Sequence, residues 1–201
     1  MQSSFTIGDL SVERFVVGPL ENNLYVLTTP SSEEALLIDA TSDEQSLLDE
    51  FARLRVTRAV ITHGHHDHIG GVAALRRRGV KVLVGEHDSS LLDGYDATLV
   101  DNELIRFGDL SLRIIATPGH TPGSVCISPE GIDVLFTGDT LFPGGPGSTK
   151  FPGGDFPTIV TSLRRIFAAH GEDTLVLPGH GASTTIGAEA GSLDDWIARG
   201  W

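Results

Sequence analysis

Short apolar runs alternate along the chain with segments of helical periodicity. Runs rich in β-branched and aromatic residues predict strands, whereas apolar residues that recur every three or four positions predict helices. We expect strands within residues 15–28, 35–39, 58–62, 81–85, 103–115, 124–128, 134–137 and 174–177, helices at residues 42–55, 70–78, 156–170 and 186–198, and a helical turn within residues 86–95. Two groups of strands separated by helices are typical of an α/β fold.

No tandem repeat, low-complexity tract or long linker divides the sequence. We therefore expect residues 1–201 to form one domain, which is long enough to bury a substantial core. Residues 142–155, rich in Gly and Pro, form the one conspicuous irregular segment. Loops of that length inside a compact domain are commonly functional.

Composition and charge exclude several classes of protein. Apolar residues make up 40% and charged residues 20% of the chain, as in ordinary globular proteins. The net charge of −13 argues against nucleic acid or an anionic membrane as the main partner. The single cysteine, Cys126, excludes an internal disulfide framework and fits a reducing cytosol. Without a signal-peptide pattern or an apolar run of about 20 residues, we expect a cytoplasmic protein.

One stretch carries a dense group of metal-ligand side chains. His63, His65, Asp67 and His68 follow an apolar run directly, in the spacing His-x-His-x-Asp-His. Imidazole and carboxylate are ligands of zinc and of borderline metals such as iron and manganese. We interpret these four residues as metal ligands and His66, at the variable position, as a residue without such a role.

Apolar runs elsewhere end in the same way. Four runs stop at small or turn-forming residues and lead directly to a ligand-type side chain: residues 59–62 before His63, 114–119 before His120, 134–138 before Asp139 and 175–179 before His180. Strands that end at a common sheet edge bring such residues together. Five imidazoles and two carboxylates exceed the needs of one tetrahedral ion, so we expect two divalent metal ions, with zinc as the first choice and iron or manganese as alternatives.

These motifs together resemble the metallo-β-lactamase superfamily and, within it, the glyoxalase II-like hydrolases. The resemblance extends over nearly the whole chain. It rests on Asn22-Asn23, Ile38-Asp39 and residues 62–71, 117–124, 138–142, 178–181 and 184–187. The resemblance implies a four-layer αβ/βα sandwich with the site between its two halves.

The resemblance also implies roles for the ligands. By that likeness, the first metal is held by His63, His65 and His120, the second by Asp67, His68 and His180, and Asp139 bridges both. The hydrolytic hypothesis is that a metal-bridging hydroxide attacks an ester-type carbonyl, with Asp67 orienting the nucleophile. A thiolate leaves without a dedicated general acid, so the expected substrate is a small-molecule acyl thioester, such as a hydroxyacyl thioester of glutathione.

Two departures from the family pattern concern substrate recognition. Full-length glyoxalase II enzymes have a C-terminal helical domain that contributes basic residues to glutathione binding, and little more than one helix follows His180 here. Many short relatives read Gly-Arg-Thr-Asp-Phe where this chain reads Gly147-Ser148-Thr149-Lys150-Phe151. Ser148 thus replaces the arginine, and Lys150 is a candidate substrate-binding residue that would supply the positive charge instead.

Other functions remain as alternatives. A persulfide dioxygenase resembles this chain but uses one iron held by the counterparts of His63, His120 and Asp139. A metal-binding module without turnover is a second alternative. β-Lactamase activity is less favoured, because Asp139 stands where many of those enzymes have cysteine or serine. The sequence does not indicate an oligomeric state.

The remaining candidate side chains have simpler interpretations. His87 and His170 lack the position at the end of a strand and are expected to play no direct role. Cys126, between Val125 and Ile127, is interpreted as a buried structural thiol. Asp39 either orients a ligand histidine or caps the following helix, and the sequence does not choose between these roles.

Overall fold

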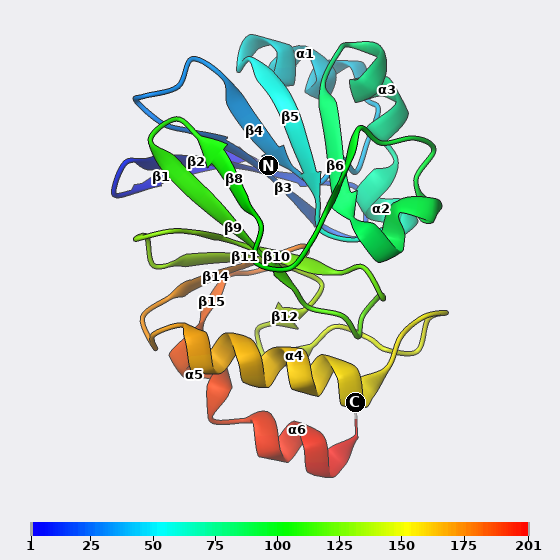
Figure 1. Ribbon diagram of the computed structural model, residues 1–201, viewed down its shortest axis with the longest axis vertical. Helices are drawn as coiled ribbons and strands as arrows, with labels where there is room; N and C mark the ends of the chain where they lie inside the picture. Colours follow the sequence, from blue (N-terminus) through cyan, green and yellow to red (C-terminus); the bar gives the residue numbers. More distant parts are fainter. Residues whose placement is uncertain (1, 201) are drawn as a thin grey trace.

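The computed structural model describes residues 2–200, which form two mixed β-sheets that face each other (Figure 1). The first sheet has seven strands in sequence order. They are β1 (Gln2–Ile7), β2 (Leu10–Val17), β3 (Asn22–Thr28), β4 (Ala35–Ile38), β5 (Val56–Ile61), β6 (Lys81–Gly85) and β7 (Ala97–Leu99). Strands β1 to β4 pair antiparallel, and β4 to β7 pair parallel.

The second sheet has six strands in the order β15-β14-β11-β10-β9-β8. They are β8 (Leu104–Phe107), β9 (Leu110–Ala116), β10 (Val125–Pro129), β11 (Val134–Gly138), β14 (Leu175–Pro178) and β15 (Thr184–Thr185). Only β11 and β14 are parallel, and the other neighbours are antiparallel. A short separate hairpin is formed by β12 (Leu141–Phe142) and β13 (Gly145–Pro146).

Helices cover the outer face of each sheet (Figure 1). On the first sheet they are α1 (Gln45–Arg53), α2 (His66–Ile69) and α3 (Val72–Arg77), and the 3₁₀ helix η1 (Glu86–Leu91) follows β6. On the second sheet they are α4 (Phe156–Ala169), α5 (Ile186–Ala190) and α6 (Leu193–Arg199). Asp155 caps α4 by accepting a hydrogen bond from the Thr158 backbone at 2.9 Å.

Three apolar clusters occupy the spaces between the layers. One joins the first sheet to its helices around Phe51 and Leu75, a second lies between the sheets around Tyr25 and Phe136, and a third joins the second sheet to its helices around Leu163. Three clusters between four layers constitute the αβ/βα sandwich, so the expected fold class is confirmed.

The structure differs from the sequence predictions at several elements. Strand β1 was not expected, because its polar sequence QSSFTI gives little β signal, and the short β7 was also missed. Residues 66–69 form a helical turn rather than a loop. The predicted helix at residues 186–198 is two helices, with Gly191 ending the first. The expected hairpin within residues 103–115 and the helical turn after β6 are confirmed.

The ends of four strands meet between the two halves of the molecule. Strands β11 and β14 run parallel, so Gly138 and Pro178 lie side by side at the same edge. The backbone N–H of Val125 donates to the carbonyl of Thr62 at 2.8 Å and thereby ties the second sheet to the end of β5. The predicted convergence of strand ends is therefore confirmed. Among the described residues, no helix is long and apolar enough to cross a membrane.

Candidate metal centre

The seven predicted ligands lie together at this edge. They form three overlapping groups in which the ligand atoms lie within 4.8 Å of one another: His63, His65 and His120; His63, His68 and Asp139; and Asp67, His68 and His180. The first and third groups contain different residues, and we call them the first and the second trio. The side chains of the trios come from the ends of β5, β9 and β14 and from α2, and Asp139 follows the end of β11.

Asp39 fixes the orientation of two histidines at once. Its Oδ2 atom accepts hydrogen bonds from His68 Nδ1 at 2.8 Å and from Thr62 Oγ1 at 2.9 Å, and Oδ1 accepts from the Thr62 backbone at 2.7 Å. Because the Thr62 hydroxyl donates to Asp39, its oxygen is free to accept from His63 Nδ1 at 3.1 Å. Asp39 therefore orients two candidate ligand histidines, which decides between its two predicted roles.

Backbone carbonyls orient two further imidazoles. His120 Nδ1 donates to the carbonyl of Ser148 at 2.7 Å, and His180 Nδ1 donates to the carbonyl of Leu20 at 2.9 Å. In both rings the Nε2 atom then points toward the cluster, where it can bind a metal ion when it carries no proton. Ser148, at the position of the family's arginine, thus supports the cluster through its backbone.

Strand β3 holds the second trio in place. Asn22 Nδ2 donates to Asp67 Oδ2 at 3.0 Å and to the Asp67 carbonyl at 3.1 Å. Asn23 Nδ2 and the hydroxyl of Tyr25 both donate to the carbonyl of Pro178, at 2.9 and 2.7 Å. The side chains of β3 therefore anchor both Asp67 and the loop that precedes His180.

The unsatisfied atoms of the cluster fit a bound cation. Among the residues described, His63 Nε2, His120 Nε2 and Asp139 Oδ1 are buried and lack a hydrogen-bond partner. Buried polar atoms without partners are costly, and metal coordination would satisfy all three. His68 Nε2 and His180 Nε2 also face each other at 3.1 Å. These atoms are consistent with a dinuclear metal site.

Gly179 leaves the space that the ligands need. A methyl group at this position would collide with Asp139 Oδ1 and would lie 2.7 Å from His68 Cε1. The backbone N–H of Gly179 donates to the Gly138 carbonyl at 2.8 Å, which keeps the two strand ends in close contact. The glycine before His180 is thus explained by close packing against the ligands.

The imidazoles of the first trio are neutral at physiological pH. Burial lowers the pKa of His63 well below its ordinary value, and the neighbouring charge of His68 lowers it further. Burial also lowers the pKa of His65 and of His120. The first trio can therefore bind a metal ion without releasing protons near neutral pH.

The histidines of the second trio have raised pKa values in the metal-free protein, unlike those of the first trio. Burial alone would lower the pKa of His180, but hydrogen bonds to Asp139 and Asp67 raise it to about 10. The pKa of His68 is raised because the charges of Asp39 and Asp139 outweigh its burial. Burial raises the pKa of Asp67 and Asp139, but the histidines overcome this effect and hold both carboxyls below their usual range. A metal ion must displace protons to bind here.

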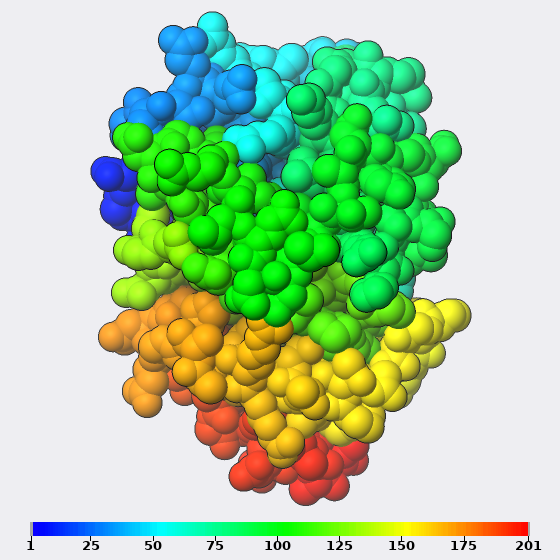
Figure 2. All heavy atoms as spheres, in the orientation of Figure 1, coloured from blue at the N-terminus to red at the C-terminus, as the bar shows by residue number. Residues whose placement is uncertain are grey.

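The cluster opens into a cleft of about 390 Å³. Its lining residues are Leu20, His65, His66, Asp67, His120, Asp139, Phe151 and His180. The loop that contains Phe151 and Lys150 stands out from the side of the molecule, as the yellow atoms in Figure 2 show. Phe151 thus brings this loop beside the cluster, and the functional importance of residues 142–155 stays a prediction.

The other sequence candidates lie outside the cluster. Lys150 is exposed and is not among the residues that line the cleft. His66 is exposed at the cleft rim, and His87 is exposed on η1. The predicted buried thiol of Cys126 is confirmed, and burial raises its pKa to about 11, which makes it a poor nucleophile.

The sequence interpretation missed Asp88, which is fully buried on η1. Its Oδ2 atom accepts from the Gly64 backbone at 2.8 Å and from Thr121 Oγ1 at 2.6 Å, and Oδ1 accepts from the Gly123 backbone at 2.7 Å. Asp88 thereby joins the loop of His63 to the loop of His120. An acidic residue in a predicted turn gives no local signal of such a role.

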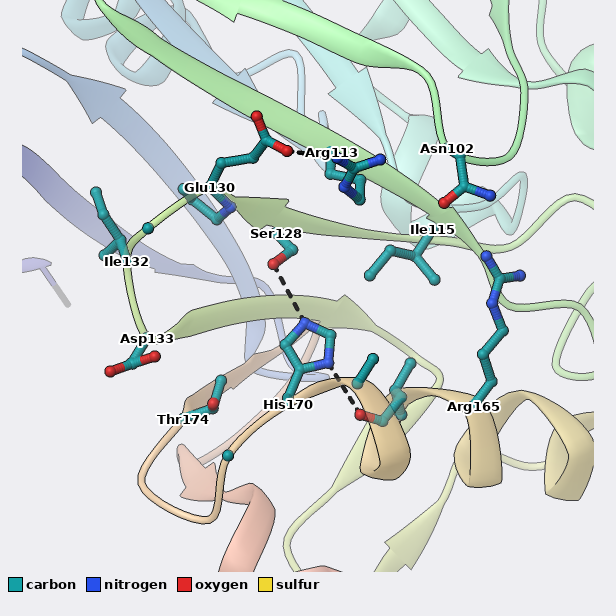
Figure 3. Close-up of a pocket in the computed structure, with 15 residues that line it drawn as sticks. Asn102, Arg113, Ile115, Ser128, Glu130, Ile132, Asp133, Arg165, His170 and Thr174 are labelled. Carbon is teal, nitrogen blue, oxygen red and sulfur yellow. Dashed lines mark hydrogen bonds and ion pairs between the residues drawn. The ribbon is translucent and has the colours of Figure 1, made fainter.

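A second cavity of about 430 Å³ lies near the C-terminal end of α4 (Figure 3). In it, Ser128 Oγ donates to His170 Nε2 at 3.2 Å, and His170 Nδ1 donates to the Ile166 carbonyl at 2.9 Å. The guanidinium groups of Arg113 and Arg165, which also line the cavity, already pair with carboxylates. His170 therefore belongs to this hydrogen-bonded group and not to the ligand cluster, as expected.

Comparison with known proteins identifies relatives of similar sequence and similar fold. The chain is 33% identical over 179 residues to "Hydroxyacylglutathione hydrolase GloC" of Haemophilus influenzae, covering 78% of this chain and 84% of that protein. The crystal structure of BLEG-1 B3 metallo-beta-lactamase superposes with a TM-score of 0.79 and 31% identity, covering 90% of this chain and 96% of that one.

A second solved structure, that of TTHA1623 in a di-iron-bound form, has a TM-score of 0.77 and 29% identity, covering 88% of this chain and 96% of that one. The family model described as "Metallo-beta-lactamase superfamily" matches residues 17–180, which include all seven clustered candidate ligands. The chain therefore belongs to the metallo-beta-lactamase superfamily.

Proposed function

We propose that this metallo-hydrolase cleaves an acyl thioester of a small thiol with the help of two divalent metal ions. The observation that carries the proposal is the position of Asp139 between the two trios. Asp139 Oδ2 lies 3.5 Å from His120 Nε2 and 3.4 Å from His180 Nε2. One carboxylate that reaches ligand nitrogens of both trios suits a bridging ligand.

The proposed ligand sets follow the two trios. His63, His65 and His120 would hold the first ion, and Asp67, His68 and His180 would hold the second, with Asp139 shared. Zinc is the proposed metal because nitrogen and carboxylate ligands suit it, and the di-iron form of TTHA1623 makes iron the alternative. When bound, such ions lower the pKa of a water molecule and polarise a carbonyl oxygen.

The protein's own side chains would position the nucleophile. Asp67 Oδ2 is engaged by Asn22 and lies 3.3 Å from His180 Nε2, so Oδ1 remains to accept a hydrogen bond from the attacking water. Asn22 would keep the carboxylate in that orientation. A thiolate leaves readily because the pKa of a thiol is about 8.5, so no dedicated acid is needed.

The relatives support a thioester over other bonds. GloC is named for hydrolysis of hydroxyacylglutathione, a thioester, and shares 33% identity with this chain. BLEG-1 is named a metallo-beta-lactamase, so a β-lactam belongs among the test compounds. We propose a hydroxyacyl or other acyl thioester because its cleavage requires only the groups that the cluster contains.

The test is hydrolysis of a panel of thioesters by the zinc-loaded protein, its Asp139→Ala variant and an Asp194→Ala control. Asp194 is exposed on α6, away from the cluster. We expect turnover by the wild type and the control, and a loss of at least a hundredfold in the Asp139 variant. Equal turnover by Asp139→Ala would refute the proposed role.

The alternative function, that of a persulfide dioxygenase, is tested with iron-loaded wild-type protein. Oxygen consumption on a persulfide by protein that contains one iron, without hydrolysis of any thioester, would replace the proposed function. Bound metal without turnover of any compound would favour the metal-binding module.

A further inference from the structure

Two exposed apolar side chains line the cleft beside the cluster. Leu20 is 56% exposed, and its carbonyl holds His180 of the second trio. Phe151 is 55% exposed, and its ring packs edge-on against His65 of the first trio, with centroids 5.5 Å apart. Each apolar side chain is thus held beside a ligand of a different trio.

Covering these two side chains with an apolar part of a ligand would be favourable. Burying a Leu or Phe side chain contributes about 1.5–3 kcal/mol relative to leaving it in water. Both side chains line the cleft together with the cluster. An aliphatic group that enters the cleft would therefore gain contact with both side chains while its reacting carbonyl lies at the cluster.

Apart from the proposed metal ions and the histidines that would bind them, the described cleft lining offers no cationic group to an anionic carrier. Among the described residues, its ionisable lining groups are histidines and the carboxylates Asp67 and Asp139, without lysine or arginine. The chain as a whole has a net charge of −13. A glutathione thioester has two carboxylates and one ammonium group. Its carboxylates would find no lysine or arginine in this lining, and its net negative charge would be repelled by the chain at long range.

We propose that the preferred substrate is a neutral thioester whose aliphatic acyl group lies between Leu20 and Phe151. This inference rests on the proposed function and specifies its substrate class. Recognition then depends on apolar contact at the acyl group and not on charge pairing with the thiol. Water attacks the thioester carbonyl, the C–S bond breaks, and the products are a carboxylate and a thiol.

A pair of substrates that differ only in the thiol tests the charge argument. The lactoyl thioesters of glutathione and of N-acetylcysteamine share the acyl group, and only the first has carboxylates. We expect kcat/KM to be at least tenfold higher for the neutral thioester at low salt. We also expect added salt to raise kcat/KM for the glutathione thioester, because screening weakens repulsion, and to leave the neutral one unchanged.

A second pair of substrates tests the contacts of the acyl group with Leu20 and Phe151. The acetyl and hexanoyl thioesters of N-acetylcysteamine differ only in the length of the aliphatic chain. We expect Phe151→Ala and Leu20→Ala each to lower kcat/KM for the hexanoyl thioester by about tenfold, while the acetyl thioester changes by less than about threefold. Leu104→Ala is the matched control, because Leu104 is 45% exposed on β8 and lies outside the cleft lining.

The outcomes separate this inference from the function on which it rests. A higher kcat/KM for the glutathione thioester, or one that falls as salt is added, would reveal a cationic subsite and overturn the inference while the thioesterase function stands. Equal losses for the acetyl and hexanoyl thioesters in both variants would also overturn it. No hydrolysis of any thioester would overturn the proposed function, and the inference with it.

Discussion

Removal of the Asp88 side chain should lower both the stability of the fold and the affinity of the first trio for metal. The buried carboxylate accepts hydrogen bonds from the Gly64 and Gly123 backbones and from Thr121. Thr121 Oγ1 has a second partner in Ser124 Oγ at 2.6 Å. Asp88→Ala therefore leaves two buried backbone N–H groups without an acceptor, and one of them adjoins His63.

The magnitude follows from these two groups. An unsatisfied buried donor costs about 1–3 kcal/mol, so Asp88→Ala should lower the free energy of unfolding by about 2–6 kcal/mol. Asp88→Asn retains one acceptor oxygen but turns an N–H group toward a backbone donor, so its cost should be about 1–3 kcal/mol. Loss of such supporting contacts typically weakens metal binding 10–100-fold, and here the first trio should be affected.

Urea unfolding of the metal-free proteins measures the first effect, and competition with a chromophoric chelator measures the second. The matched control is Asp93→Asn, an exposed position that should change stability by less than about 0.5 kcal/mol. If the Asp88→Ala protein matched the control in both stability and metal affinity, Asp88 would not join the two ligand loops as inferred.

Three further predictions concern the cluster. Gly179→Ala should lower metal stoichiometry in elemental analysis, because the added methyl group collides with Asp139, whereas retention of full metal content would contradict this packing. Since His180 has a pKa raised to about 10 and must lose its proton to bind metal, affinity at the second trio should rise with pH from 6 to 8 in metal titrations; a flat profile would refute this. Tyr25→Phe should cost about 1 kcal/mol in urea unfolding, because the Pro178 carbonyl loses one of its two side-chain donors; an unchanged midpoint would refute that contribution.

Strand ends were predictable because both the apolar runs and the ligands that follow them are local features. The runs before His63, His120, Asp139 and His180 all correspond to observed strands, and the cluster forms where these strands end. The polar edge strand β1 was missed because an exposed strand lacks the alternation that marks a buried face.

Residues that act through tertiary contacts were not predictable from local pattern. Asp88 lies in the 3₁₀ helix η1 and Leu20 in a turn, and their roles depend on loops distant in sequence. Asp39 had two equally good interpretations until its 2.8 Å contact with His68 Nδ1 decided between them. The predicted role of Lys150 in substrate binding remains a prediction, since its exposed position outside the cleft lining leaves it untested.

The number of metal ions bound per chain tests the central claim most directly. Elemental analysis of the metal-loaded protein by mass spectrometry, normalised to protein by amino-acid analysis, gives this number. The two trios with Asp139 between them predict two ions per chain for the wild type. A value of one ion per chain at saturating metal would contradict the dinuclear site.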